Sequence, residues 1–169
     1  RSAMKKFTNV LNNDTLNDIK NLLTSSDFPW RFASRITNVN DPSDLFYFIG
    51  SCYDHNQILD PRTYDLLLPL IHFLEEKIQQ KPLLLWRIKI NAYPRTHVLQ
   101  EHMPHKDYVK KGLKAFVYMI NSNDGYTRIG SEKVKSIENT GVLFESSQTH
   151  NSTTCTNAKL RLTINVNYW

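Results

Sequence analysis

The chain of 169 residues has the length of a single domain, and its 40% hydrophobic and 22% charged residues are typical of a globular protein rather than a disordered one. No run approaches the roughly 18 consecutive apolar residues that a transmembrane helix requires. The formal net charge of +5 is compatible with an acidic partner such as nucleic acid, but the basic residues are dispersed apart from short clusters such as Lys110-Lys111.

The first three residues, Arg1-Ser2-Ala3, are interpreted as a cloning remnant, so residues 4–169 are expected to form one domain. No apolar signal-peptide core follows Met4, which favours a cytoplasmic protein. Cys52 and Cys155 are the only cysteines, and neither belongs to a Cys-x-x-Cys pair. This argues against a disulfide framework and against a thiolate zinc site.

The N-terminal part of the chain, about 14–81, reads mainly as helix. One helix is expected over about 14–23, capped by Asp14, and a second over about 61–80, where Pro61 suits the first turn.

Two segments between these helices are of another kind. Residues 31–39 are expected to be extended. Residues 44–53 are apolar and aromatic, and their periodicity does not decide between a buried helix and a strand.

The C-terminal half reads mainly as strand, with a turn at 121–125. The strands are expected over about 83–93, 113–120, 142–144 and 160–168. Many short strands after a helical segment indicate an α+β, mainly β fold: a closed or double-sheet β structure buttressed by N-terminal helices. The segments 93–103 and 127–136 are expected to be mobile loops that can cover a site.

One short motif carries the candidate chemistry. In His105-Lys106-Asp107, a strand would point the imidazole and the carboxylate to the same side, where both can bind one metal. His150 is the candidate third ligand, from another strand. Two histidines and one carboxylate occupy one face of an octahedral Fe(II) and leave the other positions open, so the sequence predicts a non-haem iron site.

The last strand carries the candidate carboxylate-binding residue. Arg161, Thr163, Asn165 and Asn167 alternate with apolar residues, and a polar face is costly unless it meets water or a ligand. The planar guanidinium of Arg161 can bind a carboxylate through two hydrogen bonds. Lys159 lies on the same alternating face and is the alternative carboxylate partner.

Two further polar residues, Asn91 and Tyr93, lie on the strand that precedes the metal motif and can add hydrogen bonds to a bound ligand. His102, three residues before His105, would point to the opposite face of a strand. It is therefore expected to lie near the metal or on the surface rather than to bind the metal.

The order of these motifs resembles the 2-oxoglutarate/Fe(II) oxygenases found in marine phages, relatives of the prolyl 4-hydroxylase group. The resemblance spans nearly the whole chain after residue 27. It rests on Phe28-Pro29-Trp30, Ile88-Lys89-Ile90-Asn91, His105-x-Asp107, Tyr118-Met119-Ile120-Asn121, Asn123-Asp124-Gly125-Tyr126-Thr127, Asn139, Phe144, His150 and Arg161-x-x-x-Asn165-x-Asn167-Tyr168.

The resemblance implies a double-stranded β-helix (jelly-roll) domain that uses Fe(II), 2-oxoglutarate and O2, in the cytoplasm of the host cell if the protein is viral. It implies iron on His105, Asp107 and His150 and the distal carboxylate of 2-oxoglutarate on Arg161. The other candidate cosubstrate residues are Asn91, Tyr93, Thr163 and Tyr118.

The chain departs from the resembled pattern at two positions. Asn151 follows His150 where the family usually has a Gly soon after this histidine, and Thr140 follows Asn139 where an Arg is common. Neither departure removes a ligand.

The expected activity is hydroxylation of a substrate with release of succinate and CO2. The first expectation is a protein or peptide side chain such as proline, and a small-molecule substrate stays open. One alternative is oxidative demethylation of alkylated nucleic acid. Enzymes of that kind carry a second Arg six residues beyond the first, where this chain has Asn167. The other alternative is a non-enzymatic jelly-roll module that binds a sugar or a protein. The oligomeric state is left open.

Overall fold

The computed structural model describes residues 4–37 and 40–169; the predictions for residues 1–3 and 38–39 lie outside the described residues. In chain order the elements are β1 (Lys5–Phe7), α1 (Asn13–Leu23), β2 (Arg31–Ala33), β3 (Tyr47–Asp54), β4 (Gln57–Ile58), α2 (Pro61–Phe73), the π-helix η1 (Leu74–Gln79), β5 (Leu85–Pro94), β6 (Lys114–Met119), β7 (Tyr126–Ile129), β8 (Glu132–Lys135), β9 (Thr140–Glu145), β10 (His150–Asn151) and β11 (Leu160–Tyr168). None of these helices combines the length and the apolar composition that spanning a membrane would need.

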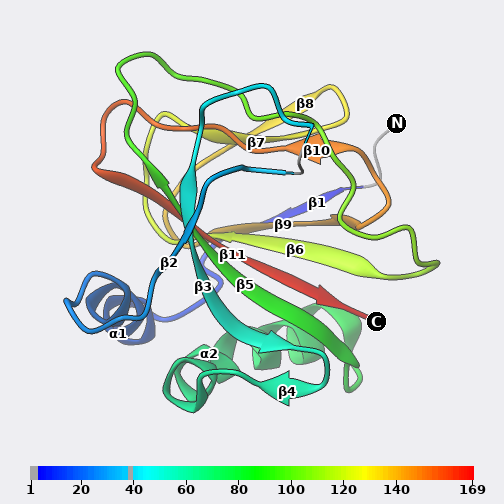
Figure 1. Ribbon diagram of the computed structural model, residues 1–169. Helices are drawn as coiled ribbons and strands as arrows, with labels where there is room; N and C mark the ends of the chain where they lie inside the picture. The colour runs from blue at the N-terminus through cyan, green and yellow to red at the C-terminus, as the bar shows by residue number, and fades with distance from the viewer. Residues whose placement is uncertain (1–3, 38–39) are drawn as a thin grey trace.

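The strands form two antiparallel sheets. The large sheet has the order β1-β9-β6-β11-β5-β3-β2, with β4 added beside β3, and the small sheet has the order β10-β7-β8. β11 is the centre of the large sheet, because it pairs with β5 along almost its whole length and with β6 from Thr163 to Tyr168. Figure 1 shows the helices below the large sheet and the small sheet above it.

Each face of the large sheet has its own core. On the helix side, apolar residues of α1 and α2 pack against Ile88 and Ile90 of β5 and Ile164 and Val166 of β11. On the other side, Val117 of β6 belongs to a second cluster with residues of β7, β8 and β9. Two sheets packed face to face with helices outside are the predicted jelly-roll architecture, which is confirmed.

The strong predictions of single elements hold within a few residues. Both helices appear where expected, although the second ends its α-helical part at Phe73 and continues as η1. The undecided segment 44–53 is the strand β3, and it pairs with β5 and β2. The prediction of a mobile loop over 127–136 is wrong, because most of this segment is the β7–β8 hairpin of the small sheet.

Asn139 ties the N-terminal segment to this core. Its side chain accepts hydrogen bonds from the Leu11 N–H (2.9 Å) and the Tyr118 hydroxyl (2.8 Å), and it donates one to the Leu11 carbonyl (2.7 Å). The residue is buried, and its φ of 61° lies in the left-handed region that Asn tolerates better than most residues.

We expect Asn139→Ala to lower the free energy of unfolding by about 2–4 kcal/mol, because it leaves buried polar groups without partners. Denaturant unfolding measures the change. Asn56→Ala is the matched control, since Asn56 has a φ of 59° but is exposed, and only backbone strain of about 1 kcal/mol is expected there. Equal losses in the two variants would contradict the role of the hydrogen bonds.

Candidate metal centre and its surroundings

His105 and His150 are brought together by the backbone. The two residues form an isolated antiparallel bridge in which each N–H donates to the other carbonyl at 2.9 Å. His150 starts β10, and β10 pairs with β7 of the small sheet. The imidazole rings consequently lie side by side, with their centroids 4.5 Å apart.

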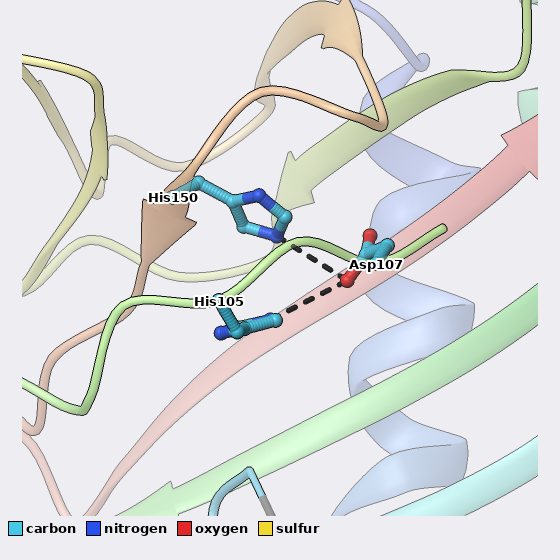
Figure 2. A group of neighbouring side chains, drawn as sticks. All are labelled: His105, Asp107 and His150. Carbon is cyan, nitrogen blue, oxygen red and sulfur yellow. Dashed lines mark ion pairs between the residues drawn. The ribbon is translucent and has the colours of Figure 1, made fainter. Parts of the chain in front are cut away.

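Asp107 joins this pair, although the predicted reason is wrong. Residues 105–107 are not a strand: only His105 is in a bridge, and Asp107 lies in a bend. The bend directs the carboxylate to both rings, so that Oδ1 lies 3.4 Å from Nε2 of His105 and 3.3 Å from Nε2 of His150. Figure 2 shows the two imidazoles pointing at the same carboxylate oxygen.

This donor set fits one metal ion. The three ligand atoms lie within 4.8 Å of one another. Ligands at right angles with bonds of about 2.1 Å are roughly 3 Å apart. The distances of 3.4 and 3.3 Å from Oδ1 of Asp107 to the two Nε2 atoms are already close to this value. Two imidazoles and one carboxylate on a single side, with a pocket on the other, suit Fe(II) rather than a closed zinc site.

The surrounding residues hold these ligands in orientation. Nδ1 of His150 faces the Gln148 carbonyl at 2.9 Å, which leaves Nε2 directed at Asp107. The other carboxylate oxygen of Asp107, Oδ2, accepts hydrogen bonds from Asn165 (3.0 Å) and Asn167 (3.4 Å) of β11. The polar face of β11 therefore hydrogen-bonds to Asp107, the carboxylate that the sequence predicts as a metal ligand.

Asp107 and His150 also perturb each other's titration. Burial raises the pKa of Asp107, but hydrogen bonds with His105 and His150 outweigh burial and hold this pKa far below its usual range. Burial lowers the pKa of His150, and the hydrogen bond and charge of Asp107 reverse this to a raised pKa. Asp107 is therefore ionised, as a metal ligand must be.

Arg161 is completely buried at the start of β11. Its guanidinium donates to the hydroxyls of Ser136 (2.7 Å), Thr127 (3.0 Å) and Ser152, and to the Thr153 carbonyl (3.4 Å). Among the described residues none of these partners carries a charge. Burial lowers the pKa of Arg161 to about 10, which leaves it a cation at neutral pH.

Lys159, the alternative to Arg161, has an exposed side chain. Arg161 instead lies behind one wall of the pocket that contains the metal triad, and the Thr127 and Ser152 hydroxyls that accept its hydrogen bonds line that wall. The structure thus favours Arg161 over Lys159 as the carboxylate partner.

The other predicted cosubstrate residues divide into two groups. Asn91, Tyr93 and Thr163 line the pocket, and Asn91 donates to the Thr163 hydroxyl at 3.3 Å. The prediction for Tyr118 is wrong. Its ring belongs to the core on the helix side of the sheet, and its hydroxyl binds Asn139, because alternate residues of β6 face opposite sides.

His102 is buried rather than exposed, and it is not one of the three grouped donor residues. Its ring is buried, and its centroid lies 4.9 Å from that of Tyr93. Burial lowers the pKa of His102 to about 3, so the ring is neutral. Tyr93 also stacks with Tyr47, with centroids 5.4 Å apart and an interplanar angle of 12°.

No role was predicted from the sequence for Tyr47, Arg87 or Lys89. All three line the pocket. Lys89 donates to the Tyr47 hydroxyl at 2.7 Å, and Arg87 lies 4.0 Å from Asp107. The alternation of charged residues along β5 was a usable signal for Arg87 and Lys89; Tyr47 lay in the segment whose structure the periodicity left undecided.

Gly125 makes the burial of Arg161 possible. A Cβ added at Gly125 would lie 2.6 Å from Cδ of Arg161 and 2.6 Å from the carbonyl oxygen of Thr154. Both distances are far below van der Waals contact, and a backbone carbonyl cannot easily move.

We expect Gly125→Ala to lower the free energy of unfolding by about 1–3 kcal/mol through overpacking, as denaturant unfolding will measure. Gly130→Ala is the matched control, because a Cβ there meets open space and only the φ of 58° opposes it, at about 1 kcal/mol. A Gly125→Ala variant as stable as the wild type would contradict the close approach.

No protein-family model matches this sequence, and no curated protein matches it significantly. Solved structures match its fold. An oxidoreductase of the 2OG-Fe(II) oxygenase family from Burkholderia pseudomallei has a TM-score of 0.71 at 12% identity, covering 98% of this chain and 84% of that one. The non-heme α-ketoglutarate-dependent epimerase SnoN from nogalamycin biosynthesis has 0.65 at 12%, covering 100% and 78%. A prolyl-4-hydroxylase from Pseudomonas putida has 0.59 at 12%, covering 99% and 92%. At these identities the likeness establishes the fold: the chain has the double-stranded β-helix of the 2-oxoglutarate/Fe(II) oxygenases.

Proposed function

We propose that this chain is an Fe(II)- and 2-oxoglutarate-dependent dioxygenase. The observation that carries the proposal is the convergence of His105, Asp107 and His150, with Oδ1 of Asp107 3.3–3.4 Å from both Nε2 atoms. The fold shared with solved oxygenases supports it. In this proposal the three residues hold the metal.

In the same proposal the distal carboxylate of 2-oxoglutarate binds Arg161, a buried cation whose partners among the described residues are uncharged. Three further residues would contact the cosubstrate, since they line the pocket that contains the triad: Asn91, Tyr93 and Thr163. An acceptor carboxylate at Arg161 would replace neutral hydroxyl partners by a charged one, which strengthens the hydrogen bonds.

Bound iron supplies O2 activation coupled to the oxidative decarboxylation of 2-oxoglutarate to succinate and CO2. The protein residues supply orientation and protection from water. Asn165 and Asn167 hold Oδ2 of Asp107, so Oδ1 stays directed at the metal position. The stacked rings of Tyr47 and Tyr93 line one side of the pocket and limit water there.

The first proposed reaction is hydroxylation of a protein or peptide side chain such as proline, supported by the fold shared with a prolyl-4-hydroxylase. The same fold also occurs in an epimerase. Nucleic-acid demethylation is less favoured, because Asn167 binds Asp107 where such enzymes carry a second Arg. From the order of the motifs we also propose that the protein is related to the marine-phage enzymes. It would then act in the cytoplasm of an infected cell.

The test is the succinate yield of the purified protein with Fe(II), 2-oxoglutarate and O2, together with Fe(II) titration under anaerobic conditions. A dioxygenase should form succinate and show a weak visible charge-transfer band when both iron and 2-oxoglutarate are present. The absence of both signals would favour the non-enzymatic binding module. A library of proline peptides, screened for a gain of about one oxygen mass, tests the substrate class.

A further inference from the structure

A second cationic region lies in the metal pocket, on the side away from Arg161. Arg87 and Lys89 of β5 line the pocket together with the triad, and they also line a neighbouring groove that continues to Arg31 of β2. The three side chains share one face of the sheet, because Arg31 is opposite Ile49 on β3, and Ile49 is in register with Asn91 on β5.

The hydrogen-bonding capacity of these cations is only partly used. Lys89 donates to the neutral Tyr47 hydroxyl and lies over the Tyr47 ring, 5.0 Å from its centroid. Nε of Arg87 is buried and has no hydrogen-bond partner among the residues that the structure describes. Such a donor is costly to bury unless a ligand or water accepts its hydrogen bond.

Few carboxylates oppose these charges. Two carboxylates line the combined pocket and groove: Asp107, 4.0 Å from Arg87, and Asp54, which pairs with the exposed His55 at 3.3 Å. Burial and the neighbouring charges of Arg87 and Arg31 lower the pKa of Lys89 to about 8, as expected of a cation held beside other cations.

If the proposed function is correct, the pocket keeps this excess of positive charge when the metal and 2-oxoglutarate are bound. A divalent metal, the Asp107 carboxylate, the two carboxylates of 2-oxoglutarate and the Arg161 guanidinium sum to no net charge. Asp107 is then occupied by the metal, and Arg31, Arg87 and Lys89 are left as a cationic wall beside the reaction position. A cationic wall in a partly enclosed pocket attracts anionic ligands and binds them through charge-assisted hydrogen bonds.

We propose that Lys89 and Arg87, assisted by Arg31 at the entrance, bind an anionic oxygen group of the substrate, a carboxylate or a phosphate, next to the metal. This names the chemical class of the substrate and rests on the proposed function. The anion accepts from Nζ of Lys89 and from the guanidinium of Arg87, and so fixes which part of the substrate faces the triad.

Matched probes can test the charge requirement. The probes are N-acetyl-aspartate N-methylamide, its neutral asparagine counterpart and N-acetyl-O-phosphoserine N-methylamide. Each is titrated into the protein loaded with Mn(II) and 2-oxoglutarate and observed by proton NMR, where paramagnetic broadening by Mn(II) reports binding next to the metal; Zn(II) gives the diamagnetic reference. We expect at least one anionic probe to bind about tenfold or more tightly than the amide, the scale of one charge-assisted hydrogen bond.

Substitutions test whether the preference for anionic probes depends on the cationic wall. Lys89→Met should remove about tenfold in affinity for the anionic probe, Lys89→Arg should retain most of it, and Arg31→Met, at an exposed position, should weaken it a few-fold. Lys81→Met removes an exposed lysine that lines neither the pocket nor the groove, and it should leave probe affinity unchanged. Circular dichroism checks that each variant is folded.

Equal binding of acid and amide, or an anion preference that survives both Lys89→Met and Arg31→Met, would overturn the proposal. Selective binding of the aspartate or of the phosphoserine probe identifies the anion. Mn(II) and 2-oxoglutarate binding are measured first on the same sample. If they fail to bind, the proposed function fails by itself, and the probe series is then read on the metal-free protein by saturation transfer.

Discussion

Replacement of Asp107 by Ala is expected to lower Fe(II)-dependent turnover of 2-oxoglutarate by at least about a hundredfold. Loss of residues that merely orient metal ligands costs about 10–100-fold, and removing a ligand should cost more. The variant keeps both histidines, but Asn165 and Asn167 lose the carboxylate that they hold. Succinate formation measures turnover, and anaerobic titration measures Fe(II) affinity.

The matched control is Asp65→Ala on the exposed surface of α2, where Ala is a favourable helix residue. It should bind Fe(II) and form succinate like the wild type. Full turnover in Asp107→Ala would refute the triad, and a loss in both variants would indicate a general effect of the substitutions.

Replacement of Arg161 by Met is expected to weaken 2-oxoglutarate binding by about a hundredfold, the scale of two charge-assisted hydrogen bonds to a carboxylate. Met fills much of the buried volume, and the Ser136, Thr127 and Ser152 hydroxyls can reorient toward each other or water. Fe(II) binding should stay near the wild-type value, because Arg161 is a hydrogen-bond partner of none of the three ligands among the described residues. Calorimetric titration of the Mn(II)-loaded protein measures the cosubstrate affinity.

Lys159→Met is the control that distinguishes the two residues predicted as possible partners of the 2-oxoglutarate carboxylate. Lys159 is two residues away in the chain and has the same positive charge, but its side chain is exposed. Its loss should change 2-oxoglutarate affinity less than twofold. A large loss in Lys159→Met with little change in Arg161→Met would reverse the assignment.

The features of the fold that follow local physical rules were mostly predictable. Pro61 begins α2 as predicted, and the long apolar alternation of β11 places Ile164 and Val166 on the helix side of the sheet. The predicted cap of α1 was wrong: the side chain of Asn12 accepts from the Thr15 N–H, and Asp14 lies inside the first turn. The short strands β7 and β8 were not predictable, since their pairing with each other and with β10 depends on contacts distant in sequence. Their polar, charged sequence has no strong alternation to reveal them.

The site also combines features that are predictable from the local sequence with features that depend on the tertiary structure. His105, Asp107 and His150 were identified by residue type and order, yet the bend that directs Asp107 to the histidines is a tertiary feature. Tyr118 was misplaced because the position of a residue in a motif does not tell which face of the sheet it occupies. The contact between Lys89 and the Tyr47 hydroxyl was not predictable either. It depends on the pairing of β3 with β5, two strands that are distant in the sequence.

The paired backbone hydrogen bonds between His105 and His150 have a consequence for metal loading. Since each amide donates to the other carbonyl, hydrogen bonds of the main chain hold the two residues side by side. Little conformational entropy is then lost when a metal arrives, so the centre is preorganised and, unlike a zinc finger, does not need metal in order to fold. After treatment with a chelator, the amide protons of His105 and His150 should still exchange slowly with deuterium, and the protein should accept iron again without refolding.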